Sequence, residues 1–432
     1  MPAPTHSAKL TKEYIDKKTP APAEGYAVHW DTTTRGFGLR VSAGGKRTFI
    51  VVGRVHNKSI WYTIGPFGRW TVDNARKKAD SVLVGMDQGI DPRQVDRETE
   101  AAQATLRQVT DAYYRDRTLK DSSKVEIERH VTTSFGTWLN RPVISITRDM
   151  VTARFNDIKA NGTTGKGPAP AQANQAFSVL RALINYAIRE HRKPDGSPII
   201  PDNPVDVLYG KWTNLKPRKG RVPDNKLGAV YAYLSDARDN AYNRDTWSSI
   251  DLVTFLLLTG ARIGEASALT WDRVSLDDDD AANCWWHIPD PKNRNPVWLP
   301  LSSQAVELLK QRPRVPGNPH VFPSWGDSGH LKDPRDTMKR VGEIAGLRVT
   351  PHDLRRTFTT IGVSACRIEI AKMELLTNHV PKGVTAQHYL ETSRLQYLYT
   401  EVQQIADHIE RKAAIARAQA SGANVVPLRA GA

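Results

Sequence analysis

The stretch PHDLRRTFTT, residues 351–360, is the one around which the rest of the chain can be organised. His352 and Arg355 are three positions apart, so a helix would place both side chains on one face. A planar guanidinium beside an imidazole is suited to hold a phosphate group. The same spacing is common on solvated helix faces, so a function for this pair depends on partners elsewhere in the sequence.

The overall charge of the chain indicates a polyanionic partner. Its 432 residues include 61 Lys and Arg against 46 Asp and Glu, which gives a net charge of +15 at pH 7. A basic excess of this kind favours nucleic acid as the partner. It says nothing about chemistry.

Cysteine usage and hydropathy predict a cytoplasmic protein without membrane association. Cys284 and Cys366 lie far apart and lack metal-ligand spacing, so they are interpreted as reduced thiols. The first 18 residues lack the apolar core of a signal peptide. The longest apolar run, residues 252–258, is too short to span a bilayer.

The first 95 residues predict a small basic domain. Residues 1–24 suggest a flexible lead with one short helix. Alternating segments at residues 36–41, 47–52 and 59–65 predict a three-stranded antiparallel sheet, followed by a helix from residue 71 to about residue 85. Such a sheet can enter a DNA groove, although its charges could equally solvate one face. The candidate DNA contacts here are Arg40, Lys46, Arg47, Arg54 and Lys58.

Helical periodicity dominates the middle of the chain. Residues 93–104 are polar and predict a linker, and residues 105–200 predict a helical domain with aromatic stripes in its core. Residues 191–224 are rich in Pro, Lys and Arg and predict a basic linker that could follow phosphates. Its candidate DNA contacts are Lys216, Arg218, Lys219 and Arg221.

Residues 220–410 predict a mainly helical domain with one strand-rich insert. An apolar helix near residues 251–258 leads into the turn TGARIGEA, residues 259–266. Two strands, residues 284–288 and 297–301, flank a tight connection that holds Lys292. Residues 411–432 predict a flexible tail.

Four side chains in this domain could act with the opening stretch. Arg262 lies in a turn whose small neighbours let an anion approach the backbone. Lys292 can present a point charge from its connection. His379 supplies a second imidazole, and Tyr389 follows ten residues later on a helical stretch.

Each of these residues also has a plainer interpretation. Arg262 and Glu265 could form a surface pair, and Lys332 or Arg294 could take the place of Lys292. Tyr397 and Tyr399 compete with Tyr389 but are better interpreted as packing residues, and His388 would face another direction on a helix. Glu265 and Asp353 are better interpreted as groups that orient arginines than as acids.

Together these motifs resemble those of the tyrosine recombinases. That family pattern is an Arg in an R-x-G-E turn, a Lys in a β-hairpin, H-x-x-R, a second His or Trp, and a Tyr. This sequence offers, in that order, Arg262, Lys292, His352 with Arg355, His379 and Tyr389. Asn378 stands where many members have Gly. The stretch GFGLRVSAGGKRTFIV, residues 36–51, is similar to the arm-binding domain of many phage and genomic-island integrases, so the resemblance covers most of the chain and looks closest to P4-like integrases.

The resemblance implies a multidomain protein, mainly α with small β-sheets. A three-stranded sheet plus helix at residues 1–95 would bind arm-type DNA, and helices at residues 105–200 would bind core-type DNA. An α+β catalytic domain would occupy residues 220–410.

The implied activity is that of a site-specific integrase that cuts and rejoins double-stranded DNA without a metal or another cofactor. Tyr389 would attack a phosphodiester and leave a 3′-phosphotyrosyl link. Arg262 and Arg355 would bind the non-bridging oxygens, and Lys292 would protonate the departing 5′-oxygen. His352 would act as the base toward Tyr389, and His379 would hydrogen-bond the phosphate.

The resemblance also implies a homotetramer on DNA in the cytoplasm of a bacterial host, in which residues 391–415 dock on a neighbouring protomer. An excision factor and a host DNA-bending protein are further expected partners. Two alternatives stay open. A type IB topoisomerase shares the Tyr, Arg and Lys chemistry, and a non-catalytic site-specific DNA-binding protein would need none of it.

Overall fold

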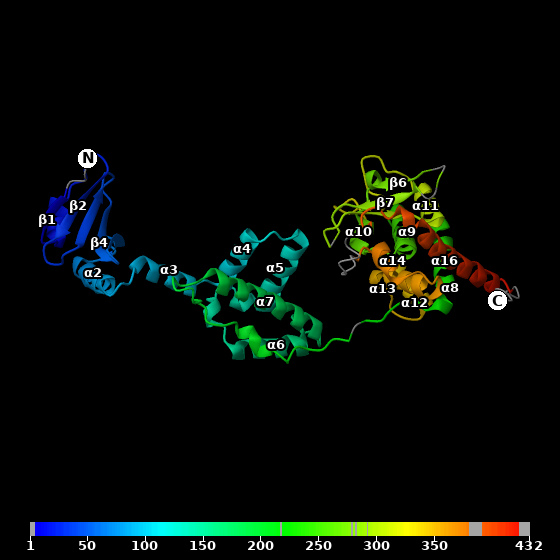
Figure 1. Ribbon diagram of the computed structural model, residues 1–432, viewed down its shortest axis with the longest axis horizontal. Coiled ribbons are helices and arrows are strands. Elements are labelled where there is room, and N and C mark those ends of the chain that lie inside the picture. Colours follow the sequence, from blue (N-terminus) through cyan, green and yellow to red (C-terminus); the bar gives the residue numbers. More distant parts are fainter. Residues whose placement is uncertain are drawn as a thin grey trace. The chain divides into compact units, whose positions relative to one another are not determined.

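The computed structural model describes residues 5–216, 218–277, 280, 283–291, 293–379 and 391–422 (Figure 1). The chain divides into two compact units, Met1–Lys216 and Pro217–Ala432. The buried apolar residues form three separate cores, of which two lie in the first unit and one in the second. Among the helices of the described part of the chain, none combines the length and apolar character needed to cross a bilayer.

The N-terminal sheet has five strands, where the sequence predicts three. β1 (Thr5–Ala8) pairs in parallel with β2 (Tyr26–Asp31), and β3 (Phe37–Ser42), β4 (Arg47–Val55) and β5 (Lys58–Pro66) follow in antiparallel order. The prediction missed β1 because it is short and polar. It missed β2 because that strand buries His29 and Asp31 and so lacks simple alternation.

The expected flexible lead is part of this domain. Leu10 and Ile15, from just before and within α1 (Lys12–Lys18), are almost fully buried in the core of the sheet. The Asp31 carboxylate accepts the Leu10 amide at 2.8 Å and the Arg76 guanidinium at 3.1 Å. Arg76 belongs to α2 (Val72–Asp87), so one buried carboxylate ties the lead, the sheet and the helix together.

Two segments predicted as linkers contain ordered structure. Residues 93–104 are mostly in α3 (Pro92–Ala102), which begins at the capping residue Asp91. The largely polar composition of α3 hid it from a search for apolar periodicity. A short 3-10 helix, η3 (Pro204–Leu208), buries Val205 and Leu208 in the core of the helical domain.

Four α-helices form that helical domain, and the aromatic stripes predicted for its core are confirmed. Phe135 stacks on Trp138 with ring centroids 5.4 Å apart, and Phe177 meets Phe135 edge-on at 5.1 Å. The helices are α4 (Leu106–Asp116), α5 (Asp121–Phe135), α6 (Arg148–Asn161) and α7 (Pro170–Glu190).

The second unit is built around α9 (Arg244–Thr259), whose residues 248–259 are all buried. A three-stranded sheet lies beside the helices, and it contains both predicted strands and a short third one. The strands are β6 (Val274–Ser275), β7 (Trp285–Ile288) and β8 (Val297–Pro300). The surrounding helices are α8 (Asp224–Asp239), α10 (Ile263–Ser267), α11 (Ser303–Lys310), α12 (Arg335–Ala345), α13 (Pro351–Thr360), α14 (Ile370–Leu376) and α16 (Tyr399–Ala420).

The opening stretch forms α13, so His352 and Arg355 do lie on a helix, and the local sequence explains why. Asp353 accepts the Thr350 amide at 2.9 Å, and Pro351 occupies the first turn, so the helix begins with a capping box. Leu354 and Phe358, one turn apart, are fully buried. The helix is therefore fixed at its start and along one face.

The C-terminal segment packs on the second unit of its own chain. The Trp298 amide donates to the Ser393 carbonyl at 2.7 Å, and α16 runs along α8. A Cβ at Gly228 of α8 would lie only 2.1 Å from the Lys412 carbonyl oxygen, so the two helices can approach this closely because position 228 is glycine. Helix α16 continues to Ala420, through half of the stretch that was predicted to be a tail.

Candidate active site

Arg355 is a buried cation held by neutral groups. Its Nη1 donates to the Gly260 carbonyl at 2.9 Å, and its Nη2 donates to the Thr377 carbonyl. The residue is 5% exposed, and burial, helped by the nearby Arg262 charge, lowers the pKa of Arg355 to about 10. The guanidinium is thus still charged at neutral pH, and its carbonyl partners do not neutralise it. A fixed cation of this kind favours an anionic ligand.

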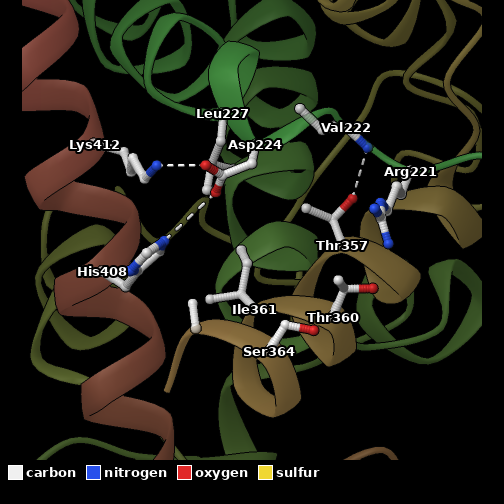
Figure 2. A pocket seen from close by; sticks show the side chains of 11 residues that line it. Arg221, Val222, Asp224, Leu227, Thr357, Thr360, Ile361, Ser364, His408 and Lys412 are labelled. Atoms are coloured by element: carbon white, nitrogen blue, oxygen red, sulfur yellow. Dashed lines mark hydrogen bonds and ion pairs between the residues drawn. The ribbon is translucent and has the colours of Figure 1, made fainter. Parts of the chain in front are cut away.

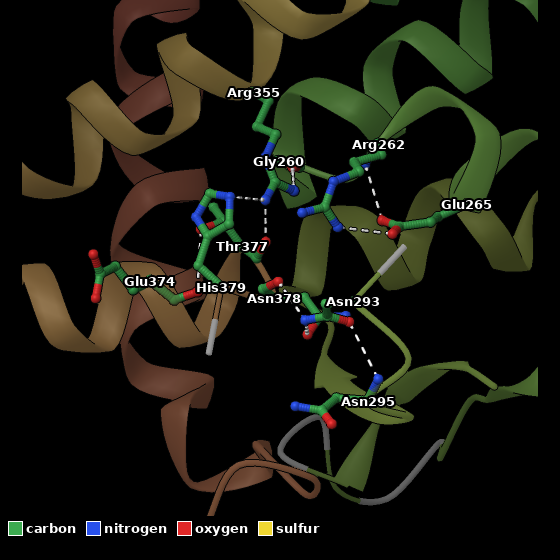
Figure 3. Close-up of polar contacts among 10 residues, drawn as sticks. All are labelled: Gly260, Arg262, Glu265, Asn293, Asn295, Arg355, Glu374, Thr377, Asn378 and His379. Atoms are coloured by element: carbon green, nitrogen blue, oxygen red, sulfur yellow. Dashed lines mark hydrogen bonds and ion pairs between the residues drawn. The ribbon is translucent and has the colours of Figure 1, made fainter. Parts of the chain in front are cut away.

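Arg262 lies at the N-cap of α10 and faces the same region as Arg355 (Figure 3). Its Nη1 donates to Glu265 Oε1 at 2.8 Å, and the Arg262 and Glu265 side chains are only 25% and 10% exposed. This pair is therefore partly buried rather than a solvated surface pair. The geometry suits the role predicted for Glu265, which is to orient the arginine.

Gly260 has a structural role that the sequence did not suggest. Its backbone has a left-handed conformation with φ of 63°, which ends α9 and turns its carbonyl toward Arg355. A Cβ there would lie 2.5 Å from a ring carbon of Phe358. Glycine at this position serves the packing of α13 on α9, in addition to any approach of an anion.

His379 follows the C-terminal end of α14 and completes the group in Figure 3. Its Nε2 lies 3.4 Å from Arg355 Nη2, and its Nδ1 lies 3.2 Å from Thr377 Oγ1. Burial and the charges of Arg355 and Arg262 lower the pKa of His379. The imidazole is therefore neutral at pH 7, and the structure brings Arg262, Arg355 and His379 together from three separate segments.

His352 lies in the first turn of α13 and is more exposed than Arg355. Partial burial and the charges of Arg356 and Arg355 lower its pKa, so His352 is also neutral at pH 7 and could accept a proton. The Asp353 contacts are compatible with its predicted role, which is to orient an arginine. Its carboxylate caps α13 and accepts Arg356 Nη1 at 3.2 Å, so the arginine that it contacts is Arg356.

Lys292, Tyr389 and His388 lie outside the described residues. Among the alternatives, Lys332 is exposed, and Arg294 is exposed with φ of 61°. The Tyr397 hydroxyl donates to the Glu391 carbonyl at 3.1 Å, and Tyr397 is 53% exposed rather than a packing residue. The Tyr399 hydroxyl donates to Gln403 Oε1 at 3.1 Å.

The candidate DNA contacts differ in their surroundings. Arg47 donates to the Thr19 carbonyl at 3.2 Å, and the Arg40 guanidinium lies 6.0 Å from the centre of the Tyr26 ring, so both have internal partners. Among the described residues, the remaining candidates are exposed and make no hydrogen bond or ring contact of this kind: Lys46, Arg54, Lys58, Lys216, Arg218, Lys219 and Arg221.

Sequence reasoning missed two sets of groups: the carbonyls that hold Arg355, and the side chain that holds the connection after β7. The Gly260 and Thr377 carbonyls are backbone atoms and carry no sequence signal. Asn293 donates to both oxygens of Asn378, and its position directly after Lys292 was a signal that could have drawn attention to it. The described residues contain no group of three His, Cys, Asp or Glu side chains suited to a metal ion.

A cavity of about 360 Å³ lies on another face of α13 (Figure 2). Thr357 and Thr360 line it together with His408 and Lys412 of α16. Thr357 is two residues from Arg355, so the two side chains leave the helix in nearly opposite directions. None of the candidate catalytic residues that the structure describes lines this cavity, so we do not assign the chemistry to it.

The lowered pKa values of His352 and His379 predict how stability depends on pH. Between the folded pKa values and the unfolded value of about 6.5, the unfolded chain binds more protons than the folded chain. The stability of the second unit should therefore fall as the pH is lowered from 7 to 5.5, which urea unfolding at constant ionic strength would measure. Replacing both His352 and His379 by Gln should make this dependence shallower. If the free energy of unfolding of the double variant depended on pH as steeply as that of the wild type, the lowered pKa values of His352 and His379 would be contradicted.

Two family models and several known proteins match this chain. Residues 10–99 match the arm DNA-binding domain family, and residues 228–394 match the phage integrase family. Prophage integrase IntF of Escherichia coli strain K12 is 24% identical over 426 residues, covering 88% of this chain and 86% of that protein. Prophage integrase IntZ of the same strain is 25% identical over 407 residues, covering 88% and 91%.

Solved structures of lambda integrase are also similar. A tetramer bound to a Holliday junction has 16% identity and a TM-score of 0.48, covering 80% of this chain and 96% of that chain. A dimer bound to a COC' core site has 17% identity and a TM-score of 0.47, covering 82% and 94%. The two family matches confirm the resemblance read from the motifs. The chain therefore belongs to the phage integrase family of site-specific tyrosine recombinases and carries an N-terminal arm DNA-binding domain.

Proposed function

We propose that this recombinase integrates and excises a mobile element by cutting DNA through a 3′-phosphotyrosyl intermediate formed on Tyr389. The observation that carries the proposal is the meeting of Arg262, Arg355 and His379. Two guanidinium groups held close together repel each other, and a phosphodiester between them would relieve that repulsion. The site therefore favours a phosphate over a neutral ligand.

The division of labour follows from charge and hydrogen-bonding capacity. Arg355 is already oriented by two carbonyls, so it can stabilise the charge that develops on the non-bridging oxygens without reorganising. Arg262, oriented by Glu265, serves the same oxygens. In the tautomer that carries its proton on Nε2, the neutral imidazole of His379 donates a hydrogen bond to the phosphate. The neutral imidazole of His352 accepts the Tyr389 proton.

Lys292 protonates the departing 5′-oxygen in this proposal. The P–O bond to the 5′-oxygen breaks as the bond to the Tyr389 oxygen forms, so the number of phosphoester bonds is conserved. The 5′-hydroxyl of a partner strand can then attack the phosphotyrosine and release the enzyme. Neither direction needs an external energy source, which makes strand exchange reversible.

The assembly proposed is a homotetramer on two duplexes. Exchange between two duplexes breaks four strands, and each protomer offers one nucleophile, so four protomers match four cleavages. Residues 1–95 would bind arm-type sites, and residues 105–200 with the basic linker would bind core-type sites. The net charge of +15 and the arm-domain match support a large DNA interface.

A suicide substrate tests this function directly. A duplex containing the attachment site carries a nick just beyond the scissile phosphate, so that the short 5′-hydroxyl strand diffuses away after cleavage. Wild-type protein should then accumulate as a covalent protein–DNA adduct that survives denaturant and disappears on protease digestion. No adduct on the true site would refute the proposal, and site-independent relaxation of supercoiled plasmid would favour a topoisomerase instead.

A further inference from the structure

The side chain of Asn293 bridges two segments that are 85 residues apart in sequence (Figure 3). Its Nδ2 donates to the Asn378 backbone carbonyl at 3.0 Å and to Asn378 Oδ1 at 2.9 Å. Its Oδ1 accepts the Asn295 amide at 3.2 Å. One amide group therefore stabilises its own turn and holds that turn to the end of α14.

Asn378 is suited to receive this bridge. It has a left-handed backbone with φ of 48°, a conformation that Asn adopts more readily than most residues, and it is 6% exposed. Its amide donates to the Leu375 carbonyl at 2.8 Å, and the His379 amide donates to the Glu374 carbonyl at 2.8 Å. These bonds fix the direction in which the chain leaves α14 toward His379.

The end of α14 thus connects two parts of the active site. The Thr377 carbonyl accepts Arg355, and the next residue, Asn378, accepts Asn293. Asn293 directly follows Lys292 in the connection between β7 and β8. Residues 377–379 therefore contact Arg355, the proposed phosphate clamp, on one side. On the other side they contact Asn293, which is next to the proposed proton donor Lys292.

We propose that Asn293 and Asn378 are a positioning pair that holds the β7–β8 connection against the end of α14, so that proton donation and phosphate binding occur at one place. The inference rests on the proposed function of Lys292 as general acid. A hairpin connection anchored only by its own strands moves easily, and displacement of a catalytic group by about 1 Å can slow a reaction roughly a hundredfold. The amide bridge restricts that movement at the residue next to Lys292.

A change of leaving group tests the pair. In DNA whose scissile 5′-oxygen is replaced by sulfur, the departing thiolate is a weak base and needs no proton from a general acid. Asn293→Ala should slow single-turnover cleavage of ordinary DNA by roughly 10- to 100-fold, and cleavage of the sulfur-containing DNA by less than about threefold. Normal cleavage of the sulfur substrate also shows that the variant is folded.

Asn295→Ala is the matched control, because it removes the same side chain two positions later. The Asn295 contact to Asn293 comes from its backbone amide, so this variant should cleave both substrates like wild type. Asn378→Gly keeps the left-handed backbone and the carbonyl but removes Oδ1, and should have a smaller effect than Asn293→Ala. Combining the two changes should slow cleavage by less than the product of the single effects.

The outcomes separate this inference from the function on which it rests. If the sulfur-containing DNA restores cleavage by Lys292→Ala but not by Asn293→Ala, Lys292 is the general acid and the positioning pair is refuted. If Lys292→Ala is not rescued, the assignment of Lys292 fails. In that case the pair survives only if Asn293→Ala and Asn378→Gly are non-additive on ordinary DNA. Wild-type cleavage of ordinary DNA by Asn293→Ala would overturn the inference outright.

Discussion

Tyr389→Phe is expected to eliminate the covalent adduct on a suicide substrate while leaving DNA binding intact. Phenylalanine keeps the ring but lacks the oxygen that would bond to phosphorus, so no other step of the reaction can follow. Loss of a catalytic nucleophile costs on the order of 10⁶-fold in rate, which is below detection in an adduct assay. A mobility-shift titration at fixed salt should give an affinity within about threefold of wild type, because the phosphate and groove contacts remain.

The matched controls are the two nearby tyrosines. The Tyr397 and Tyr399 hydroxyls donate to Glu391 and Gln403, respectively, so each already has a partner within the chain. Tyr397→Phe and Tyr399→Phe should both form adduct in normal yield. Adduct formation by Tyr389→Phe, together with its loss in either control, would transfer the role of nucleophile to that tyrosine. Peptide mapping of the wild-type adduct gives the same answer independently.

Arg355→Lys is expected to slow cleavage by roughly 10²- to 10³-fold, the loss seen when one preorganised donor to a developing oxyanion is removed. Lysine keeps the charge but not the planar fork, so it cannot bond Gly260, Thr377 and a phosphate oxygen in the same geometry. Unlike Asn293→Ala, this variant should gain no special benefit from a sulfur leaving group, because its defect is in phosphate stabilisation. Single-turnover rates on both substrates measure the difference.

Arg355→Met should in addition destabilise the second unit. It removes both donors, and each buried carbonyl left without a partner costs about 1–3 kcal/mol. Urea unfolding would report this loss. Arg340→Ala on α12 is the control, since Arg340 forms an exposed pair with Glu343 at 2.8 Å and should change neither rate nor stability by much. Cleavage by Arg355→Lys within about threefold of wild type would refute its role as the phosphate clamp.

Much of the second unit could be read from local patterns. The apolar run at residues 251–258 predicts part of α9, and the two strand segments on either side of Lys292 predict β7 and β8. These features depend on residues that are close in sequence. The order of Arg262, His352, Arg355 and His379 along the chain was likewise visible, because side-chain chemistry is written in the sequence.

The errors share a physical cause. Strand β2 and helix α3 lack apolar periodicity, so neither produced the signal that the predictions relied on. The lead at residues 1–24 is ordered by Asp31 and Arg76, which lie beyond it in the chain.

By itself, the sequence determined the residue types of the site, their order and the basic character of the chain. Only the tertiary structure decided what holds them. Arg355 is oriented by the carbonyls of Gly260 and Thr377, and the connection after β7 is joined to α14 by Asn293. Every residue carries a carbonyl, so only the fold selects which of them meets the cation. The three-dimensional packing of α9, α13 and α14 makes that selection.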